Sequence, residues 1–282
     1  MPLALILSSF VAASRIGGAA QQYVLAAHKI DPVLAPTVMF GRSPARGGQG
    51  EITTAEVFQR MLGDIEADAI FGMVDLVITG HFSLPDQVDI AAGVLERVRD
   101  APREGVGNGR RPVVVVDPIM GDRPKGLYVP PTVADRIADR LVPLADFITP
   151  NMWELDLLSG KDLYTAKDAV AAARALGRPA LITSAPAGEG EIGLIYVDAE
   201  NAVLFAHPEA DAAPNGTGDL VTACFGACLI NGMTPLAAAE NAARAAAEAV
   251  KAAKDWRATE LPVVALATRL VRPTAQVRIE RL

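Results

Sequence analysis

The amino-acid sequence predicts an α/β fold in which helices cover both faces of a mostly parallel central sheet. Short apolar runs alternate with segments of helical composition, and this alternation is typical of a parallel sheet with crossover helices. The clearest run, residues 113–116, is four valines in succession, as expected for a strand buried on both faces. The chain has 282 residues, 51% of them hydrophobic, which is enough for one large core. We therefore expect a single domain over residues 1–282.

The predicted strands of the first half of the chain are short and apolar, and several end on a polar residue or a glycine. They are residues 3–7, 33–39 (interrupted by Pro36), 74–80, 113–117 and 146–150. Helical composition marks the segments between and after them, at residues 17–28, 55–67, 85–100, 132–141, 154–158 and 166–176. Two glycine-containing segments, residues 41–50 and 103–111, are predicted loops.

The second half begins with a cluster of strands at residues 180–183, 192–197 and 202–206. A buried helix is predicted over residues 221–230, because this run is almost wholly apolar. Thr234 and Pro235 then form an N-cap followed by proline at the first helical position, which predicts an alanine-rich helix to about residue 255. Residues 261–271 fit either a strand or a helix.

Composition excludes several classes of partner. The 26 Lys and Arg against 33 Asp and Glu give a net charge of −7 without a basic run, so we expect no nucleic-acid partner and no membrane partner. No apolar run reaches the roughly 18 residues of a membrane span. Residues 1–7 lack a basic start, so a first core strand is expected rather than a signal peptide. Cys224 and Cys228, four apart on one helix face, predict packed thiols and a cytoplasmic location.

Several strand-terminal residues are expected to line one edge of the sheet. In open parallel sheets, ligands bind outside the carboxyl ends of the strands. The residues at those ends are Ser9, Gly80, Asp117, Thr149 and Thr183. The sequence therefore predicts a single site at this edge.

A glycine turn precedes the predicted helix at residues 221–230. Gly216 and Gly218 flank Thr217, and Asp219 follows. Glycines let the backbone approach a ligand closely, and the free N–H groups of a helix start suit a phosphate. A carboxylate beside a phosphate needs its own explanation, and a general base for an attacking hydroxyl supplies one. The alternative is that Asp219 only caps the helix.

Two further motifs carry candidate ligands. Asp117 ends a strand, and Asp122 lies in the loop after it; Asp117 suits Mg²⁺, although a capped turn would explain it as well. Asn151 and Glu154 are three apart at a helix start, where they could contact a metal and phosphates or form a capping box, and spacing alone favours the box. Thr183 begins a Thr-Ser pair that ends a strand and could offer hydroxyls to a phosphate.

The three histidines share no spacing that indicates a metal site. His28 is predicted on a helix surface and His207 in a loop. His81 follows the strand-end Gly80 and is the histidine expected at the site. No nucleophile elbow and no Gly-x-x-x-x-Gly-Lys-Thr loop is present in the sequence.

Three motifs together resemble the ribokinase-like kinases in order and approximate spacing. They are residues 117–121 (Asp-Pro-Ile-Met-Gly), 149–154 (Thr-Pro-Asn-x-x-Glu) and 216–219 (Gly-Thr-Gly-Asp). Within that superfamily the chain resembles the pyridoxal kinases, on the strength of Ser8-Ser9, residues 128–130 (Tyr-Val-Pro) and residues 146–151. The resemblance covers nearly the whole chain and implies a ribokinase-like three-layer sandwich.

The resemblance implies ATP-dependent phosphorylation of the 5′-hydroxymethyl group of pyridoxal, a step of vitamin B6 salvage. Asp219 would be the general base, and Gly216, Thr217 and Gly218 would supply the anion hole. ATP would be the co-substrate and Mg²⁺ the metal, while a requirement for K⁺ stays open. The resemblance also implies a homodimer.

The same resemblance assigns the nucleotide side of the site. Asp117, Asn151 and Glu154 would organise Mg²⁺ and the triphosphate, with Asp117 and Glu154 as the metal residues. Thr183 and Ser184 would approach the nucleotide phosphates.

The substrate side departs further from the family pattern. Ser9 and Thr37 match positions that contact the pyridine ring in pyridoxal kinases, and His81 falls where the family often has tyrosine. Residues 10–15 and 41–44 differ from the usual family strings, which leaves the acceptor open.

Three alternatives therefore remain from the sequence. A hydroxymethylpyrimidine (phosphate) kinase shares the phosphate motifs. A sugar or nucleoside kinase is disfavoured because no separate β-lid follows the first strand. A non-catalytic protein that binds pyridoxal phosphate would suit the altered ring side, but the intact Asp219 argues against it.

Overall fold

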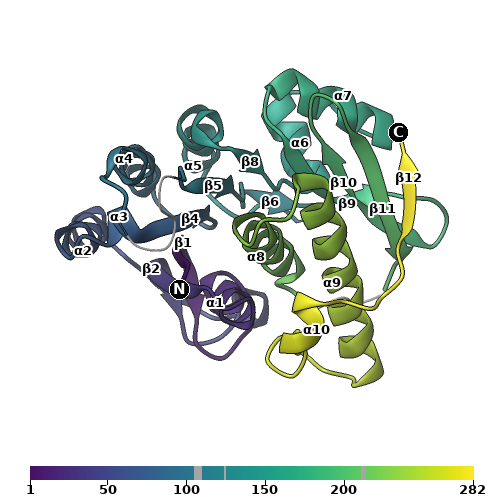
Figure 1. Ribbon diagram of the computed structural model, residues 1–282, viewed down its shortest axis with the longest axis horizontal. Coiled ribbons are helices and arrows are strands. Elements are labelled where there is room, and N and C mark those ends of the chain that lie inside the picture. The colour runs from purple at the N-terminus through teal and green to yellow at the C-terminus, as the bar shows by residue number, and fades with distance from the viewer. Residues whose placement is uncertain (105–109, 124, 211–213) are drawn as a thin grey trace.

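The computed structural model describes residues 1–104, 110–123, 125–210 and 214–282, and it contains one large sheet between two layers of helices (Figure 1). The parallel strands of the sheet are β1 (Leu3–Val11), β2 (Asp31–Phe40), β4 (Val74–Thr79), β5 (Val113–Val116), β8 (Phe147–Ile148) and β9 (Ala180–Pro186). The antiparallel strands are β3 (Gly50–Ile52), β10 (Glu191–Val197), β11 (Ala202–Pro208) and β12 (Arg278–Arg281). This arrangement confirms the predicted fold class.

The ten strands lie in the order β12-β11-β10-β9-β8-β5-β4-β1-β2-β3. The parallel strands therefore form the centre, and the antiparallel strands extend the sheet at both ends. A separate two-stranded ribbon, β6 (Gly121–Asp122) with β7 (Gly126–Leu127), follows β5.

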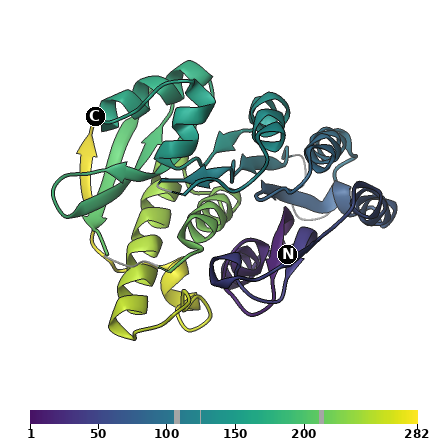
Figure 2. The ribbon, with the colours of Figure 1, turned by 180° about the vertical axis from the view of Figure 1, so that it is seen from behind.

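Helices cover both faces of the sheet, and Figures 1 and 2 show the two layers from opposite sides. One layer contains α2 (Ala55–Ala67), α3 (Ile70–Met73), α4 (Pro85–Asp100), α5 (Pro131–Arg136) with its continuations η2 (Ile137–Leu141) and η3 (Val142–Leu144), α6 (Met152–Ser159) and α7 (Ala166–Leu176). The other layer contains α1 (Gly18–Ala27), α8 (Thr217–Ile230), α9 (Pro235–Asp255) and α10 (Ala267–Val271). A short 3-10 turn, η1 (Pro44–Arg46), lies between β2 and β3.

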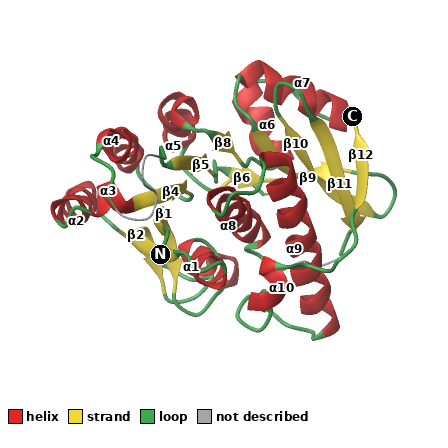
Figure 3. Ribbon diagram, viewed as in Figure 1, coloured by secondary structure: helices red, strands yellow, loops and turns green. Residues whose placement is uncertain are grey.

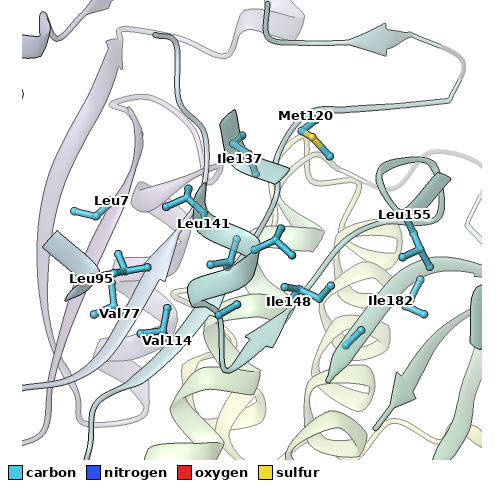
Figure 4. Packing of buried hydrophobic residues seen from close by; sticks show 14 of the residues in the cluster. Leu7, Val77, Leu95, Val114, Met120, Ile137, Leu141, Ile148, Leu155 and Ile182 are labelled. Carbon is cyan, nitrogen blue, oxygen red and sulfur yellow. The ribbon is translucent and has the colours of Figure 1, made fainter. Parts of the chain in front are cut away.

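Strand alternation divides the interior into two hydrophobic cores. In β5, Val114 and Val116 face the first core while Val115 faces the second, as expected for side chains that alternate across a strand. Figure 4 shows the first core, where Leu95 of α4 lies near Val77 of β4 and Val114. Both faces of the central strands are therefore buried, which explains their unbroken apolar runs.

Helix α8 lies in the middle of the second layer and is buried nearly all round. The Phe225 ring packs edge-on against Phe147 of β8, with ring centroids 5.2 Å apart. A Cβ on Gly226 would lie 2.9 Å from a methyl carbon of Leu76, so the helix approaches β4 closely. This packing fixes where the amino end of α8 meets the sheet.

Most predicted elements are confirmed, as Figure 3 shows by secondary structure, and the helices at 55–67, 85–100, 166–176 and 235–255 have the expected bounds. Strands β3, β6, β7 and β12 were not predicted. Residues 263–266 form turns and α10 follows, so the ambiguous segment 261–271 contains a helix. Within the expected loop at 103–111, residues 105–109 lie outside the described part of the chain.

Several local expectations were wrong. Strand β2 continues through Pro36, because β3 pairs only with Val38–Phe40 and leaves Pro36 beside an open edge. His207 is a buried residue of β11, because pairing with β10 continues to Pro208. His28 is also buried, at the carboxyl end of α1, where Asn231 after α8 donates to its carbonyl oxygen (3.4 Å).

No helix within the described ranges combines the length and the apolar character needed to cross a membrane.

Phe225→Ala should lower the free energy of unfolding by about 3–5 kcal/mol, because it removes a fully buried ring and leaves a cavity between α8 and β8. The shift in the urea unfolding midpoint of the purified protein measures this effect. Tyr164→Ala is the matched control, since Tyr164 is 70% exposed, and its effect should stay within about 0.5 kcal/mol. Equal midpoints for the two variants would contradict the role of Phe225 as an anchor of α8.

Candidate active site

A cavity of about 810 Å³ opens at the carboxyl edge of the parallel strands. The carboxyl ends of β4 and β5, the β8–α6 junction and the start of α8 all contribute to its lining. The predicted site residues that line it are Ser9, His81, Asp117, Asn151, Glu154, Thr183, Ser184, Gly216, Gly218 and Asp219. Thr149, predicted at the same edge, lines it too. Side chains that are distant in the sequence therefore line one cavity.

Two predicted site residues, Thr37 and Thr217, do not line the cavity, and neither does Gly80 among the predicted strand ends. Thr37 is fully buried, and its hydroxyl donates to the carbonyl oxygen of His81 (2.6 Å). Thr217 donates from its hydroxyl to the carbonyl oxygen of Pro214 (3.1 Å), which braces the turn before α8. Neither hydroxyl reaches the cavity. Thr37 contacts a lining residue only by its hydrogen bond to the His81 backbone.

The start of α8 presents backbone N–H groups without helical partners at the edge of the cavity. Gly216 has φ 95°, a left-handed conformation that suits glycine, and a Cβ there would overlap the carbonyl oxygen of Arg15. Leu220 N–H donates back to the Gly216 carbonyl (3.0 Å), so the N–H groups of residues 217–219 precede this helical bond. A Cβ on Gly218 would meet open space, which leaves that backbone accessible from the cavity. These features suit a phosphate group.

Asp219 lies in the first turn of α8 and is 7% exposed. Its Oδ2 accepts a hydrogen bond from Gly17 N–H (2.8 Å), whereas its buried Oδ1 has no partner within the described residues. Burial raises the pKa of Asp219 to about 6, and the Gly17 hydrogen bond opposes that rise. A buried carboxylate with one oxygen held and the other unpaired is suited to accept a proton from a bound hydroxyl.

Asp117 ends β5, as predicted, and a hydrogen-bonded chain holds its carboxylate. Thr222 Oγ1 donates to Asp117 Oδ2 (2.9 Å) and lies 2.8 Å from Thr149 Oγ1. Burial raises the pKa of Asp117 well above its ordinary value; the charges of Glu154 and Asp219 add to the rise, and the Thr222 bond opposes it. Glu154 and Asp219 therefore both lie close enough to repel the Asp117 carboxylate.

The capping box predicted for Asn151 and Glu154 is confirmed. Glu154 N–H donates to Asn151 Oδ1 (2.9 Å), and Asn151 N–H donates to Glu154 Oε2 (2.8 Å). Glu154 Oε1 also accepts from Met120 N–H (2.9 Å), which ties the loop after β5 to α6. Burial raises the pKa of Glu154 to about 7, and the backbone N–H groups of Asn151, Met120 and Gly121 oppose that rise.

The Thr183-Ser184 pair differs from the prediction, because β9 does not end there. The strand continues to Pro186, and its register with β10 shifts next to this pair. Ser184 has φ 55°, an unusual left-handed conformation for a side chain other than glycine. Both residues still line the cavity, where the irregularity turns the chain toward the site.

The part of the cavity lined by His81 and the β2–β3 hairpin includes features that the sequence did not reveal. Burial lowers the pKa of His81 to about 4, so the imidazole is neutral at pH 7, and its Nε2 lies 3.2 Å from Ser83 Oγ. An apolar wall faces the cavity from the β2–β3 hairpin, formed by Val38, Phe40 and Ile52. The alternation of Val38 and Phe40 along β2 was the signal available in the sequence.

A cation would have to be held by few protein groups. Within the described residues, no cluster of three or more His, Cys, Asp or Glu side chains could hold a metal ion. Asp117 Oδ1 accepts no hydrogen bond from a described residue, whereas both Glu154 oxygens already accept backbone N–H groups. This donor set fits Mg²⁺, which keeps several waters and takes further oxygens from phosphates.

Comparison with known proteins identifies the family. A family model described as phosphomethylpyrimidine kinase matches residues 95–264, more than half of the chain. Pyridoxine/pyridoxal/pyridoxamine kinase of Bordetella avium is 32% identical over 84% of this chain and 80% of its own length. Pyridoxal kinase PdxY of Deinococcus radiodurans is also 32% identical, over 78% of this chain and 76% of its own length.

The fold comparison agrees over the full length. The structure of pyridoxal kinase from Leishmania donovani in complex with ADP and pyridoxamine matches all of both chains, with a TM-score of 0.90 and 22% sequence identity. At this identity the match shows the shared fold. Together, the family model, the two relatives and the fold show that the chain belongs to the pyridoxal kinase family of ribokinase-like kinases.

Proposed function

We propose that this protein is an ATP-dependent pyridoxal kinase, which transfers the γ-phosphoryl group of ATP to the 5′-hydroxymethyl group of pyridoxal. The observation that carries the proposal is the position of Asp219, a buried carboxylate beside the N–H groups of a helix start. Relatives named as pyridoxal kinases favour pyridoxal over a hydroxymethylpyrimidine as the acceptor, although the family model has the latter's name.

Asp219 is the general base in this proposal. Its unpaired Oδ1 takes the proton of the hydroxymethyl group as that oxygen attacks the γ-phosphorus, and the bond between that phosphorus and the bridging oxygen of ADP breaks. Gly17 N–H holds the other carboxylate oxygen, so the base keeps its orientation. A positioned base of this kind contributes about 10²–10⁴-fold to the rate.

The N–H groups of residues 217–219 would bind the phosphoryl group that moves. They lie at the amino end of α8, where the helix dipole favours negative charge. Gly218 lines the cavity and leaves space for that group, since a Cβ there would have no neighbouring atom within 4 Å. Positioning and charge stabilisation supply most of the catalysis in such transfers.

Asp117 and Glu154 would hold Mg²⁺, while Asn151, Thr183 and Ser184 would lie along the nucleotide phosphates. When bound, the metal neutralises charge on the phosphate oxygens. The carboxylates of Asp117, Glu154 and Asp219 repel phosphates without such a cation, which supports a metal-bound nucleotide as the species that enters.

The ring of the acceptor would lie against the apolar wall of Val38, Phe40 and Ile52. Neutral His81 and the Ser9 hydroxyl would supply polar groups from the same cavity.

We further propose a single domain, a homodimer and a cytoplasmic location. The continuous ten-stranded sheet supports one domain over residues 1–282. The buried free thiols of Cys224 and Cys228 support a reducing compartment. The homodimer rests on the family resemblance alone.

The choice of acceptor is tested by giving the purified protein Mg-ATP with pyridoxal, pyridoxine, pyridoxamine or hydroxymethylpyrimidine. We expect kcat/KM for pyridoxal to exceed that for hydroxymethylpyrimidine by at least about tenfold, a difference of about 1.4 kcal/mol in transition-state binding. Faster phosphorylation of the pyrimidine would replace the proposed acceptor. Tight binding of pyridoxal phosphate without ATP turnover would indicate a binding protein instead.

Asp219→Asn should lower kcat by about 10²–10⁴-fold, because the amide keeps the acceptor for Gly17 N–H but cannot take a proton. The same change should raise the urea unfolding midpoint at pH 8, since a buried charge is removed. Steady-state kinetics and urea unfolding measure the two effects. Asp255→Asn, at an exposed residue paired with Lys251, is the control and should leave both quantities unchanged. Near-normal turnover in Asp219→Asn would remove the base assignment.

Below about pH 6, kcat/KM for pyridoxal should fall tenfold per pH unit. Burial raises the pKa of Asp219 to about 6, and only its ionised form accepts the proton. The profile is measured at saturating Mg-ATP, so that titration of groups that bind the nucleotide does not contribute. A flat profile down to pH 5 is incompatible with this assignment.

A further inference from the structure

Thr222 is a hydroxyl residue in an otherwise apolar stretch of α8. It is 1% exposed and lies between Val221 and Ala223, which belong to the second core. A buried hydroxyl without a partner is costly, so its contacts indicate why it is there. Its Oγ1 donates to Asp117 Oδ2 at 2.9 Å and lies 2.8 Å from Thr149 Oγ1.

The direction of these bonds follows from proton counting. A threonine hydroxyl has one proton, and an ionised carboxylate only accepts. Cation binding requires an ionised Asp117. In that state the Thr222 hydroxyl donates its proton to the hydrogen bond with Asp117, so Thr149 must donate to Thr222. The result is a directed chain from Thr149 through Thr222 to the carboxylate.

This chain holds Asp117 against electrostatic repulsion. Glu154 and Asp219 both repel the Asp117 carboxylate, and within the described residues the Thr222 hydroxyl is its one side-chain hydrogen-bond donor. Because Thr222 holds Oδ2, the free Oδ1 is the oxygen available to the cavity that Asp117 lines.

We propose that Thr222 is a positioning residue, which orients Asp117 so that Oδ1 faces the metal ion of a metal-bound nucleotide. Thr222 does not line the cavity, so it acts through its hydrogen bond to Asp117, with Thr149 as the donor that completes the chain. The inference rests on the proposed function, since it assumes that a Mg²⁺-nucleotide binds here. It adds that α8 supplies both the base and, one turn later, the support for the metal-binding carboxylate.

Thr222→Val tests the proposal, because it keeps the shape of the side chain and removes the hydroxyl. We expect its Kd for Mg-ATP, measured by calorimetry, to rise about tenfold, the effect of losing a hydrogen bond to a charged group worth about 1.5 kcal/mol. The affinity for ATP without Mg²⁺ should stay unchanged. KM for Mg-ATP should rise, and Thr222→Ser, which restores the hydroxyl, should return both constants to within about threefold of wild type.

Phe225→Leu is the structural control, since it disturbs α8 one turn further on without touching Asp117. It should leave the Mg²⁺ dependence of nucleotide binding unchanged. If Thr222→Val does not fold, Thr222→Cys takes its place, because a thiol is only a weak donor.

The proposal is overturned if Thr222→Val binds Mg-ATP as wild type does, or if it loses affinity equally with and without Mg²⁺. Failure of the proposed function would look different. In that case the wild-type protein would phosphorylate no acceptor, whereas calorimetry would still report the Mg²⁺ dependence of nucleotide binding and its response to Thr222.

Discussion

The close approach of the segment after β1 to the start of α8 is the contact on which the site depends. A side chain at Gly216 would overlap the Arg15 carbonyl oxygen. Two residues further along the chain, Gly17 N–H donates a hydrogen bond to the Asp219 carboxylate. The two segments therefore meet backbone to backbone. Because α8 is also anchored by Phe225 against β8, the carboxylate of Asp219 and the N–H groups beside it have little freedom to move.

The second constraint is the negative charge of three buried carboxylates. Each carboxylate is stabilised by its own hydrogen-bond donors. Glu154 is held by backbone N–H groups from two segments, Asp219 by one such group, and Asp117 by a threonine hydroxyl. Hydrogen bonds to the ionised form offset part of the free-energy cost of burying each charge. They leave a concentration of negative charge in a cavity proposed to bind phosphates, and a metal ion that enters with the nucleotide would resolve that conflict.

The periodicity of apolar residues was sufficient to predict the central strands and the long helices. Their apolar patterns follow directly from which of their faces are buried. The periodicity also brought Ser9, Asp117, Thr149 and Thr183 to one edge, since strand ends of a parallel sheet converge. The resemblance to the ribokinase-like kinases added Asn151, Glu154 and Asp219 to the same site. The periodicity did not predict β3, β6, β7 or β12, which are short and depend on tertiary pairing. Thr222 was missed because a lone hydroxyl in an apolar helix gives no signal until its partner at residue 117 is known. His28 and His207 were misplaced because burial by distant segments decided their environment.

The two halves of the cavity have different supports. The phosphate half is built on the interior strands and on α8, where any change must fit two cores and a crowded backbone. The half proposed to hold the acceptor ring includes Val38, Phe40 and Ile52 from a peripheral hairpin, whose last strand, β3, is three residues long and hydrogen-bonded along one side only. A change at exposed or half-buried positions of this hairpin would disturb few backbone contacts, so the proposed acceptor could change over evolution while the phosphate-binding residues stay the same.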